Sequence, residues 1–113
     1  MGANRTDKIA RLVQKELGTY FQRNSQSMFQ GKMITVTAVR VTADLALAKV
    51  YLSLFPVEDK QQFLAMINEQ NSRIRYDLGT RIGKQVRIIP ELRFYLDDSL
   101  DYIENIDNLL KDQ

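Results

Sequence analysis

Residues 33–54 read MITVTAVRVTADLALAKVYLSL, in which two β-prone runs flank a short polar connector. Branched, aromatic and other apolar residues dominate both runs, residues 33–41 and 45–54. In the second run every even-numbered residue is apolar, which predicts that this face of the strand lies on the core. The first run changes parity near Ala38, which predicts a β-bulge there. We therefore expect a β-hairpin.

An amphipathic helix is expected before the hairpin, because residues 6–21 repeat their apolar side chains with a period of 3.6. The face opposite the predicted core carries a stripe of cations, three of them spaced i, i+3 and i+7. The cations of this segment are Arg5, Lys8, Arg11 and Lys15. Residues 24–31 then predict a polar, mobile loop before the first strand.

A second helical pattern follows the hairpin over residues 57–82. A straight helix of that length would measure roughly 37 Å, which exceeds the width of a domain of this size. We expect a break at residues 69–72, with Asn71 or Ser72 capping a new helix that begins at Arg73. Gly83 is the expected C-cap of that helix. The predicted kink residues are Gln70, Asn71 and Ser72.

A third strand is predicted over residues 85–96, and Pro90 predicts that it lies at a sheet edge or is bulged or split there. Acidic residues from Asp97 onward predict the start of a last helix. The expected order is α-β-β-α-kink-α-β-α. A three-stranded sheet covered by helices, in a two-layer α+β domain, fits that order.

The composition indicates one globular domain over residues 1–113, with 44% hydrophobic and 27% charged residues. Cysteine and histidine are both absent, which removes disulfides, thiolate ligands, cysteine nucleophiles and the usual near-neutral titrating group. We expect no catalytic residues, no metal and no cofactor. With no long apolar run and no apolar N-terminal stretch, we expect a soluble, cytoplasmic protein without membrane contact.

The net charge of +2 is divided unevenly along the chain. Residues 1–90 carry 14 Lys and Arg against 7 Asp and Glu, whereas residues 91–113 carry 2 against 7. This asymmetry favours a polyanion-binding face and a separate acidic face. A basic cluster after the predicted break suits phosphate. It consists of Arg73, Arg75, Arg81, Lys84 and Arg87. The alternative is that these residues are merely solvated or pair with Asp77 or Glu69.

Two further patterns are weaker. The acidic group Asp97, Asp98 and Asp101 has the residue type for Mg²⁺, but helix capping explains it better. Tyr51 and Tyr95 are candidates for base stacking on the exposed side of their strands, although ordinary packing is the commoner role of strand aromatics. Neither a P-loop nor a G-x-G-x-x-G motif occurs.

Several motifs together resemble the ribosome-binding factor A family. The hairpin contains VTAV and DLALAKVY, similar to the VT-x-V and DL-x-x-AKVY segments of that family. Residues 74–79 (IRYDLG), 87–94 (RIIPELRF) and 97–99 (DDS) resemble its IR-x-x-LG, R-x-x-PEL-x-F and D-x-S elements in the same order. The resemblance covers nearly the whole chain. The family's Ala-x-Gly kink corresponds to residues 70–72, where this chain has neither residue.

The resemblance implies a KH-like, type II domain. It further implies a non-catalytic assembly factor, expected to be a monomer, that binds the free 30S ribosomal subunit. Such a factor promotes late maturation and 5′-end processing of 16S rRNA, with a role in growth in the cold. We expect the RNA-binding residues to be Arg5, Lys8, Arg11, Lys15, Lys49, Arg73, Arg75, Arg81, Lys84 and Arg87.

Other functions stay open at this point. A KH-like regulator of other RNAs would bind short single strands without 30S subunits. A protein-interaction module that uses the acidic last helix would lack salt-dependent RNA affinity. A small Mg²⁺ enzyme built on the acidic group is the most remote alternative.

Overall fold

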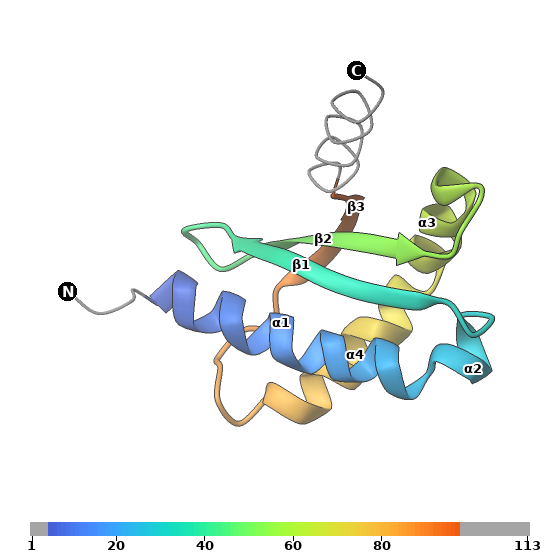
Figure 1. Cartoon of the computed structure of the whole chain (residues 1–113). Coiled ribbons are helices and arrows are strands. Elements are labelled where there is room, and N and C mark those ends of the chain that lie inside the picture. Colours follow the sequence, from blue (N-terminus) through green and yellow to red (C-terminus); the bar gives the residue numbers. More distant parts are fainter. Residues whose placement is uncertain (1–4, 98–113) are drawn as a thin grey trace, which may run out of the picture.

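The computed structural model describes residues 5–97, which fold as helices packed on a small sheet (Figure 1). The elements are α1 (Arg5–Arg23), α2 (Ser25–Met28), β1 (Met33–Val41), β2 (Leu47–Phe55), α3 (Lys60–Glu69), α4 (Asn71–Ile82) and β3 (Glu91–Leu96). This order confirms the predicted α+β arrangement with a break between two central helices, and it adds the short helix α2. The predicted last helix lies outside the described residues.

The three strands form one sheet in the order β1-β2-β3. β1 and β2 are antiparallel, as expected of a hairpin, whereas β2 and β3 are parallel. Parallel neighbours need a crossover connection, which α3 and α4 provide. The register of β1 shifts between Val36 and Ala38, so the predicted bulge is confirmed.

The core lies between the helices and one face of the sheet. On β2 the buried residues are Ala48, Val50, Leu52 and Leu54, which confirms the face predicted from parity. The helices contribute Val13, Leu17, Tyr20 and Phe21 from α1, Phe63 and Ile67 from α3, and Ile74, Leu78 and Ile82 from α4. Burial of each large side chain contributes about 1.5–3 kcal/mol, so this shared core fixes the helices against the sheet.

The hairpin turn is longer than predicted, and β2 begins at Leu47 rather than Leu45. The Asp44 carboxylate accepts hydrogen bonds from the Thr42 hydroxyl (2.7 Å) and the Ala46 amide (3.1 Å). These bonds, the hydroxyl first, hold the pKa of Asp44 below its ordinary value. Leu45 has a φ of 63°, in the left-handed region. The turn's own hydrogen bonds therefore take two residues out of the strand.

The prediction of a mobile loop over residues 24–31 is wrong in part. Its first half forms α2, and Phe29 is fully buried, with its ring centroid 5.3 Å from that of Phe21. Gly31, at a φ of 73°, then turns the chain toward β1. The buried ring anchors this segment, although its polar composition suggested a loop.

The third strand is shorter than predicted, beginning at Glu91 rather than residue 85. Proline cannot donate a ladder hydrogen bond, and the strand starts directly after Pro90. Residues 85–90 form a loop in which Ile88 is 54% exposed. The edge position predicted for this strand is confirmed.

Candidate nucleic-acid interface

The cations of α1 form one line on its solvent side, which we name the α1 stripe (Arg5, Lys8, Arg11 and Lys15). All four are exposed, whereas Val13 and Leu17 on the other side of the helix are buried. Among residues 5–97, no carboxylate lies within ion-pair distance of any of the four. Their charges are therefore free to neutralise the phosphates of a nucleic acid.

Arg87 joins one end of the α1 stripe. A surface depression of about 410 Å³ is lined by Arg5 and Lys8 of α1 and by Arg87 and Ile88 of the loop before β3. Leu45 of the hairpin turn also lines it. The fold thus brings together three predicted RNA-binding residues, two from the start of α1 and one from the loop before β3.

The predicted break between the central helices is confirmed, but the predicted capping is wrong. α4 begins at Asn71 rather than Arg73, and Gln70 is the N-cap, with no side-chain hydrogen bond to the helix. The Asn71 side chain instead donates from Nδ2 to the carbonyl of Leu92 on β3, at 2.6 Å. Asn71 therefore ties the start of α4 to the sheet.

A groove of about 730 Å³ lies between α4 and β3, next to this break. Asn71, Ser72 and Tyr76 line it from the helix, and Glu91 and Leu92 line it from the strand. Tyr76 is 77% exposed, an unusually open position for an aromatic side chain. Tyr76 was not among the residues predicted from the sequence. Its position outside the apolar period of α4 was the available signal.

The Arg75 side chain is hydrogen-bonded within the protein. Its guanidinium donates from Nη2 to the carbonyl of Ile89 (2.7 Å) and from Nε to that of Pro90 (3.1 Å). These bonds hold the loop that leads into β3. Contact between Arg75 and RNA stays a prediction, and the structure gives this residue a positioning part in the fold.

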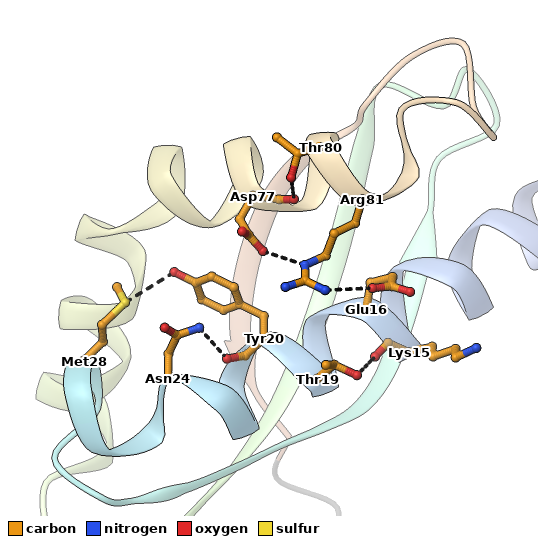
Figure 2. A network of polar contacts seen from close by, with 9 residues as sticks. All are labelled: Lys15, Glu16, Thr19, Tyr20, Asn24, Met28, Asp77, Thr80 and Arg81. Carbon is orange, nitrogen blue, oxygen red and sulfur yellow. Dashed lines mark hydrogen bonds and ion pairs between the residues drawn. The ribbon is translucent and has the colours of Figure 1, made fainter.

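Arg81 is also occupied. Figure 2 shows its side chain reaching from α4 toward α1, between Asp77 and Glu16. Its Nε lies 3.0 Å from Asp77 Oδ2, and its Nη1 lies 3.9 Å from Glu16 Oε2. Pairing with Asp77 was the alternative that the sequence left open, and that pair is present. Two acidic neighbours reduce the charge that Arg81 can offer to phosphate.

Tyr20 extends this contact region along α1 (Figure 2). Its hydroxyl donates to Met28 Sδ at 3.5 Å. Burial raises the pKa of Tyr20 above its ordinary value, and the Asp77 carboxylate adds to the increase while Arg73 opposes it. The neutral hydroxyl and the Arg81 pairs thus bind α1 to its neighbours on the side away from the stripe.

The remaining predicted cations occupy different places. Arg73 and Lys84 are exposed, and no carboxylate lies within ion-pair distance of either among the described residues. Lys49 is exposed on β2, on the side of the sheet opposite the core. The structure therefore does not group Lys49 with the α1 stripe.

The chain is similar to proteins of one known family over nearly all of its length. The family model described as "Ribosome-binding factor A" matches residues 5–110. The chain belongs to the ribosome-binding factor A family. Ribosome-binding factor A of Cytophaga hutchinsonii is 44% identical over 110 residues, covering 97% of this chain and 83% of the relative. That of Flavobacterium psychrophilum is 43% identical over 111 residues, covering 97% and 85%.

Solved structures of ribosome-binding factor A share the fold. The crystal structure of the Thermus thermophilus protein matches with a TM-score of 0.68 at 20% identity, covering 82% of this chain and 97% of that one. Thermus thermophilus ribosome-binding factor A as fitted into a cryo-electron-microscopy map of its 30S complex matches with a TM-score of 0.55. That match has 23% identity and covers 77% of this chain and 93% of the other. The three-stranded α+β arrangement of this family member is therefore the fold of solved ribosome-binding factor A structures.

Two other features bear on the site of this family member. Each helix within residues 5–97 is too short or too polar to cross a membrane. The same residues hold no group of three or more acidic side chains placed to bind a metal ion. Of the acidic group considered from the sequence, Asp98 and Asp101 lie outside the described residues.

Proposed function

We propose that this ribosome-binding factor A family member is a non-catalytic assembly factor that acts in the cytoplasm as a monomer. It binds the free 30S subunit through 16S rRNA and promotes late maturation and 5′-end processing of that rRNA. The 30S complex of the Thermus thermophilus relative supports this proposal. So does the resemblance of the motifs along nearly the whole chain.

The observation that carries the proposal is the α1 stripe with Arg87. These cations are exposed and have no carboxylate partner among the described residues, and three of them border one depression. Phosphate contacts supply most of the sequence-independent affinity for nucleic acid and make that affinity salt-dependent. A continuous line of free cations on a rigid helix therefore suits the backbone of folded rRNA.

The groove between α4 and β3 supplies a second part of the same interface. Its polar lining from Asn71 and Ser72 and the open ring of Tyr76 suit an unpaired nucleotide, which single-stranded recognition normally stacks and hydrogen-bonds. Arg73 adds an exposed cation at the same end of α4. The α1 stripe then provides phosphate contacts, and the groove provides contacts to a base.

The test is co-sedimentation of purified 30S subunits with the full chain over a range of KCl concentrations. We expect Arg11→Glu with Lys15→Glu to weaken binding at least tenfold. The plot of log affinity against log salt should become shallower by about one unit for each phosphate contact removed. Arg23→Glu is a control, because it reverses one exposed charge in the last turn of the same helix. It should bind within about twofold of wild type.

Equal affinity of the double variant and wild type at every salt concentration would falsify the assignment of the α1 stripe. Tight binding to short RNAs without any 30S co-sedimentation would favour the regulator of other RNAs. Salt-independent binding to a protein, with no RNA affinity, would favour the interaction module.

A further inference from the structure

The face of the sheet turned away from the helices carries its own set of functional side chains. In Figure 1, α1 and α4 lie on one side of β1, β2 and β3. Alternation along β2 buries Ala48, Val50 and Leu52 toward those helices. Lys49 and Tyr51 therefore point to the opposite side. We name this side the outer face.

A row of three cations crosses the outer face. Arg40 on β1 pairs in register with Lys49 on β2, and Lys49 pairs in register with Arg93 on β3. All three are exposed. Among residues 5–97 no carboxylate lies within ion-pair distance of any of them. With strands about 4.8 Å apart, the row spans roughly 10 Å.

Such a row works against the stability of the sheet. Like charges directly opposite each other on neighbouring strands repel, and opposite charges are the favoured pairing. Here the same sign occurs on all three strands at one level of the ladder. A bound anion would neutralise the row and remove that repulsion. The phosphates of a nucleic-acid backbone are anions spaced along a chain, so they suit such a row.

An aromatic platform adjoins the row on the same face. Tyr51 and Tyr95, each two residues beyond a cation, pair in register and stack with ring centroids 5.6 Å apart and planes 28° apart. The residue opposite Tyr51 on β1 is Ala38, which has a small side chain, and Tyr51 itself is half-exposed. Stacked, accessible rings beside cations are the combination that binds single-stranded nucleic acid.

Acidic side chains border this surface without neutralising it. Glu91 lies two residues before Arg93, and Asp97 lies two residues after Tyr95. The Asp97 carboxylate accepts a hydrogen bond from the Thr37 hydroxyl at the bulge. The cation row and the tyrosine pair therefore form one patch between two acidic boundaries.

We propose that the outer face binds a single-stranded segment of RNA, with phosphates on Arg40, Lys49 and Arg93 and a base stacked on the Tyr51–Tyr95 pair. This proposal rests on the RNA-binding function proposed above and adds a second surface to it. The outer face and the α1 stripe lie on different sides of the molecule, so the two surfaces would hold two separate segments. An acidic protein segment would match the charges, but it would make no use of the stacked rings.

The test uses a fluorescein-labelled ten-nucleotide oligouridylate and fluorescence anisotropy at several KCl concentrations. Every protein is the full chain carrying Arg11→Glu and Lys15→Glu, so that the α1 stripe does not contribute. In that background, Arg40→Gln with Lys49→Gln and Arg93→Gln should lower affinity at least tenfold. The salt slope should become shallower by about two units, at 0.7 per phosphate of a single strand.

The aromatic arm separates stacking from charge. Tyr51→Leu with Tyr95→Leu should lower affinity about tenfold and leave the salt slope unchanged, because stacking releases no counterions. Tyr51→Phe with Tyr95→Phe keeps both ring faces and should bind within about twofold of the background. Thermal melting checks folding. The glutamine variant should melt at or above the background temperature, because the repulsion within the row is gone.

The proposal is overturned if the background protein fails to bind the oligonucleotide at low salt, or if the glutamine and leucine variants bind as the background does. It is also overturned if a peptide of residues 98–113, with five acidic residues and one lysine, binds more tightly than the RNA and depends on the cations alone. That result would assign the row to an acidic protein segment. Because 30S co-sedimentation is measured separately, loss of 30S binding alone would leave this test intact.

Discussion

The two basic helices of this protein, α1 and α4, differ in how many of their cations the fold engages. The four cations of the α1 stripe face solvent and have no carboxylate partner among the described residues. On α4, Arg75 holds the carbonyls of Ile89 and Pro90, and Arg81 lies between Asp77 and Glu16. The helices are neighbours on the same side of the sheet (Figure 1).

The difference comes from where each side chain lies relative to other elements. The α1 stripe is opposite the core face of its helix, and within residues 5–97 no carboxylate lies within ion-pair distance of it. The loop before β3 and the hairpin turn border it only through Arg87, Ile88 and Leu45, which bring no acidic group. α4 packs beside α1 and β3, and its long arginines reach acceptors on α1 and on the loop before β3. A guanidinium with five fixed donors finds such acceptors readily. The number of basic residues in a sequence is therefore not the number of positive charges available to a ligand.

The largest change in stability is expected when the Arg75 side chain is removed. Arg75→Ala removes two charge-assisted hydrogen bonds that hold the loop before β3, and we expect the free energy of unfolding to fall by about 2 kcal/mol. Arg73→Ala, on the same helix but with no hydrogen-bond or ion-pair partner among residues 5–97, should change it by less than about 0.5 kcal/mol. Urea denaturation followed by circular dichroism measures both. Equal midpoints for the two variants would remove the contrast between the helices.

Asn71 tests whether a neutral side chain on α4 also serves the fold. Asn71→Ala removes the half-buried bond to the Leu92 carbonyl and should lower the free energy of unfolding by about 1 kcal/mol. Ser72→Ala should cost no more than a few tenths, because Gln70 rather than Ser72 occupies the N-cap position. The same urea titrations decide this. A larger loss from Ser72→Ala would restore the capping role that the structure assigns to neither residue.

Local rules predicted much of the fold. Alternating parity identified the core face of β2 and the bulge at Ala38, and helix length against domain size identified the break near Asn71. They failed where a distant group intervenes. Residues 85–90 look like a strand, but Pro90 ends the ladder and Arg75, 15 residues earlier, binds the loop carbonyls.

The candidate site was less predictable for the same reason. The α1 stripe needs only helical periodicity, so its exposure followed from the sequence. The row of Arg40, Lys49 and Arg93 needs the register of all three strands, including the parallel pairing of β3. No local pattern contains that register. The sequence accordingly led us to predict Lys49 as an RNA-binding residue, but not Arg40 or Arg93 beside it.

The smallest expected effect is the contribution to stability of the ion pair between Arg81 on α4 and Glu16 on α1. Its atoms are 3.9 Å apart, and the side chains are 30% and 22% exposed, so water screens the interaction and a coupling of about 0.5 kcal/mol is expected. A double-mutant cycle with Arg81→Ala and Glu16→Ala measures it by urea denaturation. The Arg81 and Asp77 pair, at 3.0 Å within α4, provides a reference cycle and should couple at least as strongly. Coupling to Glu16 should weaken at high NaCl concentration, since screening shortens the reach of charges near the surface. A coupling of zero at low salt would mean that Arg81 is held by Asp77 alone, leaving its remaining donors free for phosphate and making α4 more like α1.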